Sequence, residues 1–522
     1  MLGVALDVLE GHVPDPGPAH STPSHGSEGS GPSRRSVVPA RSAAALRHAE
    51  CSDVAELPRE GDRMRFSRRS LLRRSAGACA TLAVDHALEA ARRTEPDRSG
   101  PDGAGPAVSN DDLERAVQAA PPGSTLRLRG VWSRSTPLVV DRPLTMVFES
   151  GSSITMTRDV TAIEVLTGSV AVIGARLVGA GAAASGLGRG VHVRGTAEEP
   201  LEDVHVVDCV VRDFSYDALQ FEHVRDFVVA RNTVTDLGYA GIMLLSSTDG
   251  QVVDNEVRDV HQPDGYVNSY GVIVSRDDRR DLSAAPRSAR VRVERNRISG
   301  VRRWEGIDTH SGDDVTICDN TVRDCRVGIA VVPSKDPGDR SYRIGSHRAV
   351  IARNRIERNE VLPPGSGIVV RGAGSRLGDD LDRTDAVVTG NVVVGHGGGP
   401  REAGILAYFT RGLTLSDNHL DRCERAAISL YHSNDAAIVT RNSVYGLGRS
   451  EPAQMTVAIE APSAGTSAQV LATRVRPATD GTLCSVGLVC GTGSTVTALA
   501  NDWSGAARPV GGGGTIDRCS DG

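Results

Sequence analysis

One short pattern recurs along the chain of 522 residues and constrains its fold more than any other feature. Eight times, an asparagine is followed two places later by Val, Ile or Leu, as in Ala-Arg-Asn232-Thr-Val. The asparagines are Asn232, Asn255, Asn296, Asn320, Asn354, Asn391, Asn418 and Asn442. The shortest interval is 23 residues, from Asn232 to Asn255, and the longer intervals fit the same unit with insertions. Self-similarity at such a period predicts a solenoid of stacked coils.

A second column of the repeat predicts the kind of coil. In each repeat a glycine or alanine precedes one aliphatic residue, and apolar residues then alternate with other types, as in a strand with one buried face. Each coil can bury that face only against its neighbours. We therefore predict an all-β fold, a single-stranded right-handed parallel β-helix solenoid. The inward residues are Leu219, Ile242, Val272, Ile307, Ile329, Ile368, Ile405 and Ile428.

The repeated asparagine predicts a tight corner of the coil. Asparagine tolerates the left-handed backbone conformation, and its amide bonds neighbouring backbone groups. Stacked at one corner, these amides are expected to bond each other as a ladder. Cys209 and Ala175 take the same place in earlier coils.

Periodicity and composition divide the chain into five segments. Residues 1–63 are rich in Pro, Gly, Ser and His and predict a disordered extension, with translation expected to start at Met64. Residues 64–92 begin with Met-Arg-Phe-Ser-Arg-Arg and resemble a twin-arginine export signal, with a basic linker as the alternative. A linker is expected over 93–107, the β-helix over 108–450, and a carboxy-terminal cap and flexible tail over 451–522.

A helix is predicted at the start of the β-helix segment. Residues 110–120, Asn-Asp-Asp-Leu-Glu-Arg-Ala-Val-Gln-Ala-Ala, combine an amino-terminal capping signal with amphipathic spacing, and two prolines come directly after them. We expect this helix to cap the first coil.

Because exported proteins can form disulfides, the nine cysteines are candidates for disulfide pairing. Cys209, Cys318, Cys325 and Cys423 lie within the repeat and are predicted to be small core residues. Cys484 and Cys490 lie outside the eight repeats and are the better candidates for a disulfide in a secreted protein.

Charge and hydropathy limit the partners. The net charge is −6 with no concentrated basic patch, so nucleic acid is not an expected partner. No run of 18 or more apolar residues occurs, so a membrane span is not expected. The twin-arginine signal predicts a secreted, extracellular protein, and we expect a monomer.

Catalytic side chains of a solenoid must point outward. One coil of the repeat has both an acidic residue and a histidine at its outward positions. Asp308 and His310 take the two outward places of the segment 304–312. Neighbouring coils have long insertions after the same strand, at 276–290, 333–348 and 372–385, whereas this coil has a short turn. Long loops beside a short one predict a cleft with Asp308 and His310 on its floor.

Aromatic and acidic residues near this coil are candidates for substrate binding. Tyr239, Tyr270 and Trp304 lie just before the small residue of their coils, where an exposed aromatic face would stack on sugar rings. Packing against the neighbouring coil is the alternative interpretation. Tyr431 and Glu222 take outward places in the same column as His310.

Two segments resemble known families. The capping helix and the strand after it resemble the start of pectate-lyase-like β-helix proteins. Residues 305–310, Glu-Gly-Ile-Asp-Thr-His, are similar to the Tyr-Gly-Phe/Ile-Asp-Pro-His motif of mannuronan C-5 epimerases, with Glu305 in place of the tyrosine and Thr309 in place of the proline. In that family the aspartate and histidine belong to the catalytic cluster, so the resemblance implies that Asp308 and His310 act on a uronate-containing glycan.

Abstraction of the proton beside a uronate carboxylate needs a base, a cation that neutralises the carboxylate, and a proton donor on the opposite face. We expect His310 to be the base, oriented by Asp308, with Arg371 as the neutralising cation and Tyr408 as the donor. The expected activity is that of a polysaccharide lyase or C5-epimerase acting on a polysaccharide or glycoconjugate.

Two other functions stay open. Residues 303–308 partly resemble the Asn-Thr-Asp-Gly-Ile-Asp segment of pectin-degrading glycoside hydrolases, which makes Glu305 and Asp308 a candidate carboxylate pair for hydrolysis. A non-catalytic carbohydrate-binding or surface adhesion solenoid is the third hypothesis, because a fold does not by itself imply a function.

No metal ligands are expected among the catalytic residues. Ca²⁺ is the one cofactor considered, since it takes several clustered oxygens, and Asp277-Asp278 and Asp379-Asp380 are its candidate ligands.

Overall fold

The computed structural model describes residues 110–183, 188–261, 268–337, 342–448 and 454–518. The chain divides into two units, 1–81 and 82–522, and all of the described residues belong to the second. The segments predicted over 1–63, 64–92 and 93–107 lie outside the described residues.

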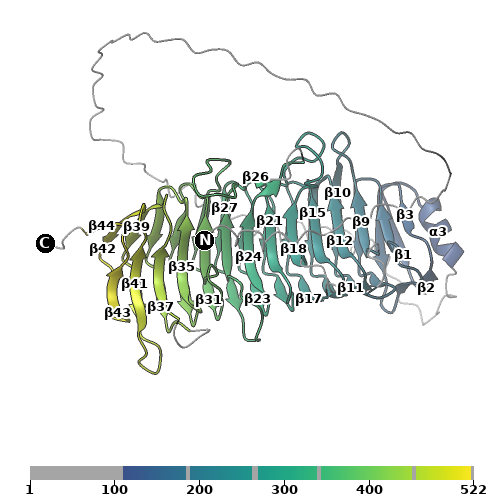
Figure 1. The fold of residues 1–522 in the computed structure, drawn as a ribbon. Helices are drawn as coiled ribbons and strands as arrows, with labels where there is room; N and C mark the ends of the chain where they lie inside the picture. The colour runs from purple at the N-terminus through teal and green to yellow at the C-terminus, as the bar shows by residue number, and fades with distance from the viewer. Residues whose placement is uncertain (1–109, 184–187, 262–267, 338–341, 449–453, 519–522) are drawn as a thin grey trace, which may run out of the picture. The chain divides into compact units, whose positions relative to one another are not determined.

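The second unit is a solenoid of three long parallel sheets, and successive coils contribute one strand to each sheet (Figure 1). Sheets A, B and C hold 15, 13 and 14 strands. Each strand pairs in parallel with its equivalent one coil earlier and one coil later, because the same apolar pattern returns at the same place in every coil. The predicted fold class, an all-β parallel β-helix with an amino-terminal helix, is confirmed.

Sheet A consists of β1 (Ser124–Leu128), β4 (Leu144–Phe148), β7 (Val170–Ile173), β10 (Leu201–Val207), β13 (Val224–Ala230), β16 (Gln251–Val253), β19 (Arg292–Glu294), β22 (Thr316–Cys318), β27 (Ala349–Ala352), β30 (Ala386–Thr389), β33 (Thr414–Ser416), β36 (Ala437–Thr440), β39 (Ser467–Leu471), β42 (Thr495–Leu499) and β44 (Thr515–Arg518). Sheet B consists of β2 (Val131–Arg134), β5 (Ser153–Met156), β8 (Arg176–Val178), β11 (Val210–Phe214), β14 (Thr233–Leu237), β17 (Glu256–Val260), β20 (Arg297–Ser299), β23 (Thr321–Arg323), β28 (Arg355–Glu357), β31 (Val392–Val394), β34 (His419–Asp421), β37 (Ser443–Tyr445) and β40 (Arg474–Arg476). Sheet C consists of β3 (Leu138–Val140), β6 (Ile163–Val165), β9 (Val191–Arg194), β12 (Asp217–Glu222), β15 (Ala240–Leu245), β18 (Tyr270–Ser275), β21 (Glu305–His310), β24 (Val327–Val332), β29 (Ile368–Arg371), β32 (Ile405–Tyr408), β35 (Ala426–His432), β38 (Val457–Ala461), β41 (Cys484–Cys490) and β43 (Ala506–Gly511). The strands β25 (Ser334–Lys335) and β26 (Tyr342–Ile344) form a separate antiparallel pair.

The helix α3 (Asn110–Ala119) closes the first coil, as predicted. Leu113 and Val117, four residues apart on one face, are buried in the same core as the strands. The helix contacts β1, β2 and β3. It therefore covers the apolar end that the first coil cannot bury against a preceding one.

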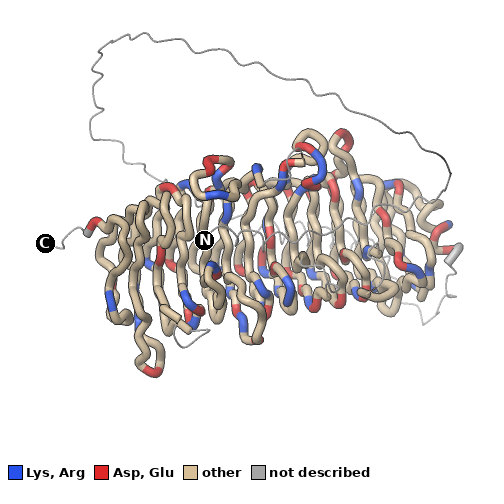
Figure 2. The backbone as a smooth tube through the Cα atoms, viewed as in Figure 1, with Lys and Arg blue, Asp and Glu red and all other residues tan. Residues whose placement is uncertain are grey.

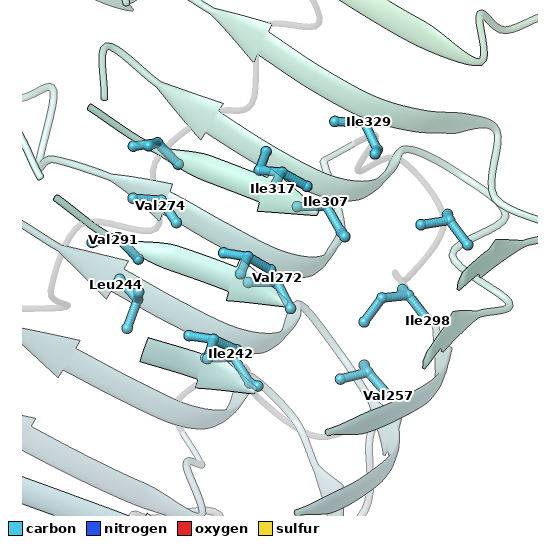
Figure 3. Close-up of a cluster of buried hydrophobic side chains, with 14 of the residues drawn as sticks. Ile242, Leu244, Val257, Val272, Val274, Val291, Ile298, Ile307, Ile317 and Ile329 are labelled. Carbon is cyan, nitrogen blue, oxygen red and sulfur yellow. The ribbon is translucent and has the colours of Figure 1, made fainter. Parts of the chain in front are cut away.

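The interior is filled by the predicted aliphatic column. All eight inward residues are fully buried. Figure 3 shows Ile242, Val272, Ile307 and Ile329 following one another along sheet C, with aliphatic side chains of the other sheets facing them. Each coil thus buries a thin apolar layer against the next.

The asparagine ladder forms as predicted, at the corner between sheets A and B. The side-chain amide of each asparagine donates to the side-chain oxygen of the next one, for example Asn296 to Asn320 and Asn320 to Asn354, both at 3.0 Å. The same amide also donates to a carbonyl of the preceding coil, as from Asn320 to Val293 at 2.9 Å. All eight asparagines are buried.

The left-handed residue at this corner is not the asparagine, so that part of the prediction is wrong. Positive φ angles fall on the residue before it, such as Asp319 (φ 59°) and Arg353 (φ 54°). The asparagine stays in the ordinary region because its side chain must point inward to reach the ladder. The left-handed residues point outward and pair across coils, Arg353 with Asp319 at 2.7 Å and Arg441 with Asp417 at 2.7 Å.

The coils continue beyond residue 450, contrary to the predicted cap and flexible tail. The strands from β38 to β44 extend all three sheets, sheet B to Arg476, sheet C to Gly511 and sheet A to Arg518. The sequence hides these coils because Ala472 and Ala500 replace the charged corner residue and Thr473 replaces the asparagine, although Asn501 occupies the ladder position again one coil later.

The predicted Cys484–Cys490 disulfide is also wrong. Both cysteines are free and buried, at opposite ends of β41. A seven-residue strand separates its ends by roughly 20 Å, far more than the ~7 Å that a disulfide allows between Cα atoms. Cys209, Cys325 and Cys423 are free and lie in the core, as predicted, whereas Cys318 is free and buried outside this core, with its thiol 3.2 Å from Glu294. Among the described residues, no helix is long and apolar enough to span a membrane.

Removing one rung of the ladder should destabilise the fold strongly. Asn320→Ala would leave the Asn296 amide, the Val293 carbonyl and the Asn354 oxygen short of a buried partner. At about 1–3 kcal/mol for each buried group left unsatisfied, we expect a loss of about 3 kcal/mol or more in the free energy of unfolding. The measurement is chemical denaturation followed by circular dichroism.

The matched control is Arg353→Ala, one coil further on, which breaks the exposed ion pair with Asp319. It should cost no more than about 1 kcal/mol. Equal losses for the two variants would show that the ladder does not fix the coils.

Candidate functional site

The outer face of sheet C carries the predicted site. β21 pairs with β18 on one side and β24 on the other, and this register places His310 beside Val332. The next strands continue the column with Arg371 and then Tyr408. Successive coils lie ~4.8 Å apart, so Arg371 is roughly 10 Å and Tyr408 roughly 14 Å from His310 along the axis.

Three side chains of β21 converge. His310 Nε2 lies 2.8 Å from Asp308 Oδ2. An oxygen of Glu305, an oxygen of Asp308 and a ring nitrogen of His310 all lie within 4.8 Å of one another. Glu305 and Asp308 are buried, while the side chain of His310 is 22% exposed. The predicted grouping of these three residues is therefore present in the structure.

Burial and mutual charge shift the pKa of each group upward. Burial, and then the charge of Asp308, raise the pKa of Glu305 well above its usual range. Burial also raises the pKa of Asp308, although the charge of His310 opposes this. Burial would lower the pKa of His310, but the neighbouring Asp308 outweighs it and the pKa is raised. The cluster therefore combines two carboxyl groups and one imidazole in a largely buried site.

An aromatic cluster lies on the same face, on the amino-terminal side of the three residues. The rings of Tyr216 and Tyr239 stack with centroids 4.7 Å apart, and Tyr239 meets Tyr270 edge to face at 5.7 Å. Tyr270 in turn meets the ring of His310 edge to face at 6.3 Å. Tyr270 is only 3% exposed, so packing explains it and the predicted sugar-stacking role is wrong for this residue.

Trp304 packs partly against this aromatic cluster and partly against a cation. Its ring contacts the cluster of Tyr270 and Met243, and the Arg326 guanidinium lies 5.4 Å from its ring centre. Trp304 and Tyr239 keep part of their surface exposed. These two aromatics remain the candidates for contact with a sugar on this side.

The coil between His310 and Arg371 carries no polar outward side chain. β24 offers Ala330, which is buried, and Val332, which is partly exposed. Arg371 comes next on β29, and its charge acts to lower the pKa of His310. Val332 therefore lies between an imidazole and a guanidinium on the same face.

Tyr342 joins the site although the repeat pattern did not predict it. It begins β26, in the insertion that comes after β24, and the Arg371 guanidinium lies 4.4 Å from the centre of its ring. Lys335 Nζ lies 5.3 Å from the same ring. An aromatic residue in the long insertion after β24 was a usable signal, but no periodicity fixes where such a loop folds.

Tyr408 and Tyr431 lie further along the face. The Arg371 guanidinium is 5.4 Å from the Tyr408 ring centre, and Tyr408 meets Tyr431 edge to face at 6.2 Å. A register shift after Ala407 pairs Tyr408 with His432, so His432 and not Tyr431 takes the column position predicted for this coil.

Glu222 belongs to a separate polar group three coils before His310. Its carboxylate lies 3.2 Å from His192 Nε2 and accepts a hydrogen bond from Gln220. The rung spacing puts Glu222 roughly 14 Å from His310 along the axis. The structure therefore does not bring Glu222 to the cluster of Glu305, Asp308 and His310.

The three predicted insertions gather at the corner between sheets C and A and are tied to one carboxylate. Asp382, in 372–385, lies 2.8 Å from Arg287 of 276–290 and 2.9 Å from His347 of 333–348. Figure 2 shows acidic and basic residues concentrated on the loops along this edge. The short turn after His310 lies between these insertions, as predicted.

Asp277, Asp379 and Asp380, three of the four residues predicted as calcium ligands, pair with neighbouring groups. Asp277 pairs with Arg279 at 2.9 Å, and Asp380 lies within 3.2 Å of both Arg383 and Arg411. Asp379 accepts backbone hydrogen bonds from residues 375 and 376. These carboxylates neutralise arginines and turn the chain, and calcium binding at these residues stays a prediction.

The ion pairs of Asp382 with Arg287 and His347, which join the three insertions, should depend on pH. Hydrogen bonds to Asp382 and Asp385 raise the pKa of His347 to about 9, while His347 and Arg287 lower the pKa of Asp382 to about 2 against the effect of burial. The histidine contribution is complete below its unfolded pKa of about 6.5 and is lost as the pH rises through about 9. The aspartate contribution is present above about 4 and is lost as the pH falls through about 2.

We therefore expect His347→Gln to speed amide hydrogen exchange in 276–290 and 372–385 at pH below about 6.5, and to leave it unchanged above about 9. Exchange measured by mass spectrometry checks this. The control is His419→Gln, on the exposed side of β34, which should match the wild type throughout. Equal exchange rates in the wild type and in His347→Gln at pH below about 6.5 would show that His347 does not hold the insertions together.

Sequence comparison supports the fold independently of the three-dimensional structure. Residues 189–444 match the family described as the right handed beta helix region. No curated protein sequence matches the chain. The chain is thus a right-handed parallel β-helix.

Solved structures with similar architecture differ in what their names say they do. A surface adhesin of Streptococcus pneumoniae, PfbA, is 11% identical, with 75% of this chain and 86% of that chain covered and a TM-score of 0.45. The catalytic domain of a GH87 alpha-1,3-glucanase is 11% identical, with 79% and 71% covered and a TM-score of 0.47. A periplasmic alginate epimerase, AlgG, is 13% identical, with 78% and 89% covered and a TM-score of 0.38.

Proposed function

We propose that this right-handed parallel β-helix protein is an exported, carbohydrate-active enzyme that removes the C5 proton of a uronate residue in a polysaccharide. The observation that carries the proposal is the order of side chains along sheet C. Asp308 and His310 of β21 come first. Val332 of β24 follows, and its strand has no polar side chain on the outer face. Arg371 of β29 comes next, with its guanidinium against the ring of Tyr342.

This order suits an anionic sugar ring lying over Val332. The gap from His310 to Arg371 is two coils, roughly 10 Å, which leaves room for one ring between their side chains. The guanidinium of Arg371 would pair with the uronate carboxylate and lower the cost of charge developing there. Lys335, beside the same tyrosine, adds positive charge on that side.

His310 is the proposed base. Its Nε2 faces Asp308, so Nδ1 is the nitrogen that takes the proton from C5. The electron pair left at C5 either expels the glycosidic oxygen at C4, which gives an unsaturated uronate, or takes a proton on the opposite face, which gives the C5 epimer. Tyr342 is the proposed proton donor in place of Tyr408, because Tyr408 lies three coils from His310.

Hydrolysis through Glu305 and Asp308 has less support. Their nearest oxygens lie within 4.8 Å, too close for the separation of about 6.5–9.5 Å that an inverting hydrolase needs to admit water. The spacing suits a retaining pair, about 5–5.5 Å, but both carboxylates lie on one strand with His310 beside them.

Export rests on the sequence alone. Arg68 and Arg69 lie in the segment that resembles a twin-arginine signal. Delivery to the cell exterior would bring the protein to polysaccharides.

The test incubates the full chain with polyuronates and with neutral glycans in deuterated water. We expect deuterium at C5 of a polyuronate, with ultraviolet absorbance of an unsaturated product if the sugar is eliminated. His310→Gln, Arg371→Met and Tyr342→Phe should each reduce the rate by about a hundredfold or more. Tyr408→Phe and the surface variant His419→Gln should stay close to the wild-type rate.

Two results would contradict the proposal in different ways. New reducing ends with neither deuterium nor ultraviolet absorbance would indicate a hydrolase. Glycan binding with no chemical change in any substrate would indicate a binding or adhesion solenoid.

A further inference from the structure

Three ligand-type side chains of β21 form a polar centre in which both oxygens of Asp308 and one oxygen of Glu305 lack a well-formed hydrogen bond among the described residues. Asp308 is fully buried, and neither of its oxygens takes part in a well-formed hydrogen bond, although Oδ2 lies 2.8 Å from His310 Nε2. Glu305 is 5% exposed, and its Oε2 has no hydrogen-bond partner. Buried carboxylate oxygens without partners are costly, so the centre is suited to a cation.

The donor atoms already lie near a common centre. One oxygen of Glu305, one oxygen of Asp308 and one ring nitrogen of His310 are within 4.8 Å of one another. No other set of three or more His, Cys, Asp or Glu side chains in the described part of the chain comes as close. Around a tetrahedral ion with bonds of about 2.0–2.1 Å, ligand atoms lie roughly 3.4 Å apart. The distances between the ligand atoms therefore need to shorten by at most about 1.4 Å, which side-chain rotation can supply.

We propose that Glu305, Asp308 and His310 bind one divalent ion of the transition series, with Zn²⁺ the best match. Two carboxylates and one imidazole suit zinc, and three protein ligands leave a coordination position open for water or for a sugar oxygen. Calcium prefers six to eight oxygens and takes no imidazole, so it fits poorly. The proposal concerns binding only and does not rest on the proposed function. An imidazole that binds zinc through Nε2 carries a proton on Nδ1, so the zinc-bound protein would not use His310 as the base.

The geometry of strand β21 explains how three of its six residues can act as ligands of one ion. Asp308 and His310, two residues apart, share the outer face of β21. Glu305 is the first residue of the strand, and one of its carboxylate oxygens lies near Asp308 and His310. Gly306 has no side chain because a Cβ there would lie 2.6 Å from Val322 and 2.8 Å from the Gly328 carbonyl.

The test is zinc titration of the full chain, freed of metal with a chelator, at one fixed pH. The wild type should bind zinc, and Glu305→Gln, Asp308→Asn and His310→Gln should each weaken this binding by at least about tenfold. Asp313→Asn, just beyond the strand and paired with Arg348, is the matched control and should bind as the wild type does. Circular dichroism without zinc checks that each variant is folded.

Location is tested separately, because other histidines and cysteines also take zinc. Crystals soaked in zinc should show an anomalous peak between the three side chains. A peak only elsewhere, or affinity unchanged in all three variants, would overturn the proposal. Displacement of zinc by equal concentrations of calcium would overturn the choice of a transition ion.

Discussion

The amide ladder between sheets A and B is the interaction on which the rest of the structure depends. From Asn232 to Asn418, each buried asparagine bonds the asparagine of the next coil and a carbonyl of the preceding one, so these coils are fixed to both neighbours. A slip of one residue would break the ladder and turn the aliphatic column outward at the same time. The register of all three sheets therefore depends on one corner.

That fixed corner decides where the chain can vary. The coils cannot lengthen at the ladder without leaving buried amides unpaired, whereas the corner between sheets C and A tolerates long insertions. The insertions at 276–290, 333–348 and 372–385 all lie there and meet at Asp382. The same fixed register brings His310, Val332 and Arg371 into one line on sheet C. A rigid scaffold thus presents one chemically distinctive strand beside loops of variable length.

The sequence was sufficient for the features that repeat. The eight asparagines, the aliphatic column and the outward Asp308 and His310 are predictable from period and alternation, which the stacked coils impose directly. Features that depart from the sequence repeat were not predicted from the repeat. Tyr342 lies in an insertion, and His432 enters the column through a register shift. Glu305 was predicted from the motif resemblance and not from the period, because strict alternation would send its side chain inward. The last coils were not predicted because their corners are Ala472-Thr473 and Ala500-Asn501, without the charged residue that comes before most of the other asparagines.

The proposed function depends on an acidic sugar lying over Val332, between His310 and Arg371. A crystal structure of the protein with a uronate oligosaccharide tests this position most directly. We expect density for one uronate ring over Val332, with its carboxylate at the Arg371 guanidinium and its C5 facing His310. Density on sheet A or B, or a carboxylate bound away from Arg371, would contradict it.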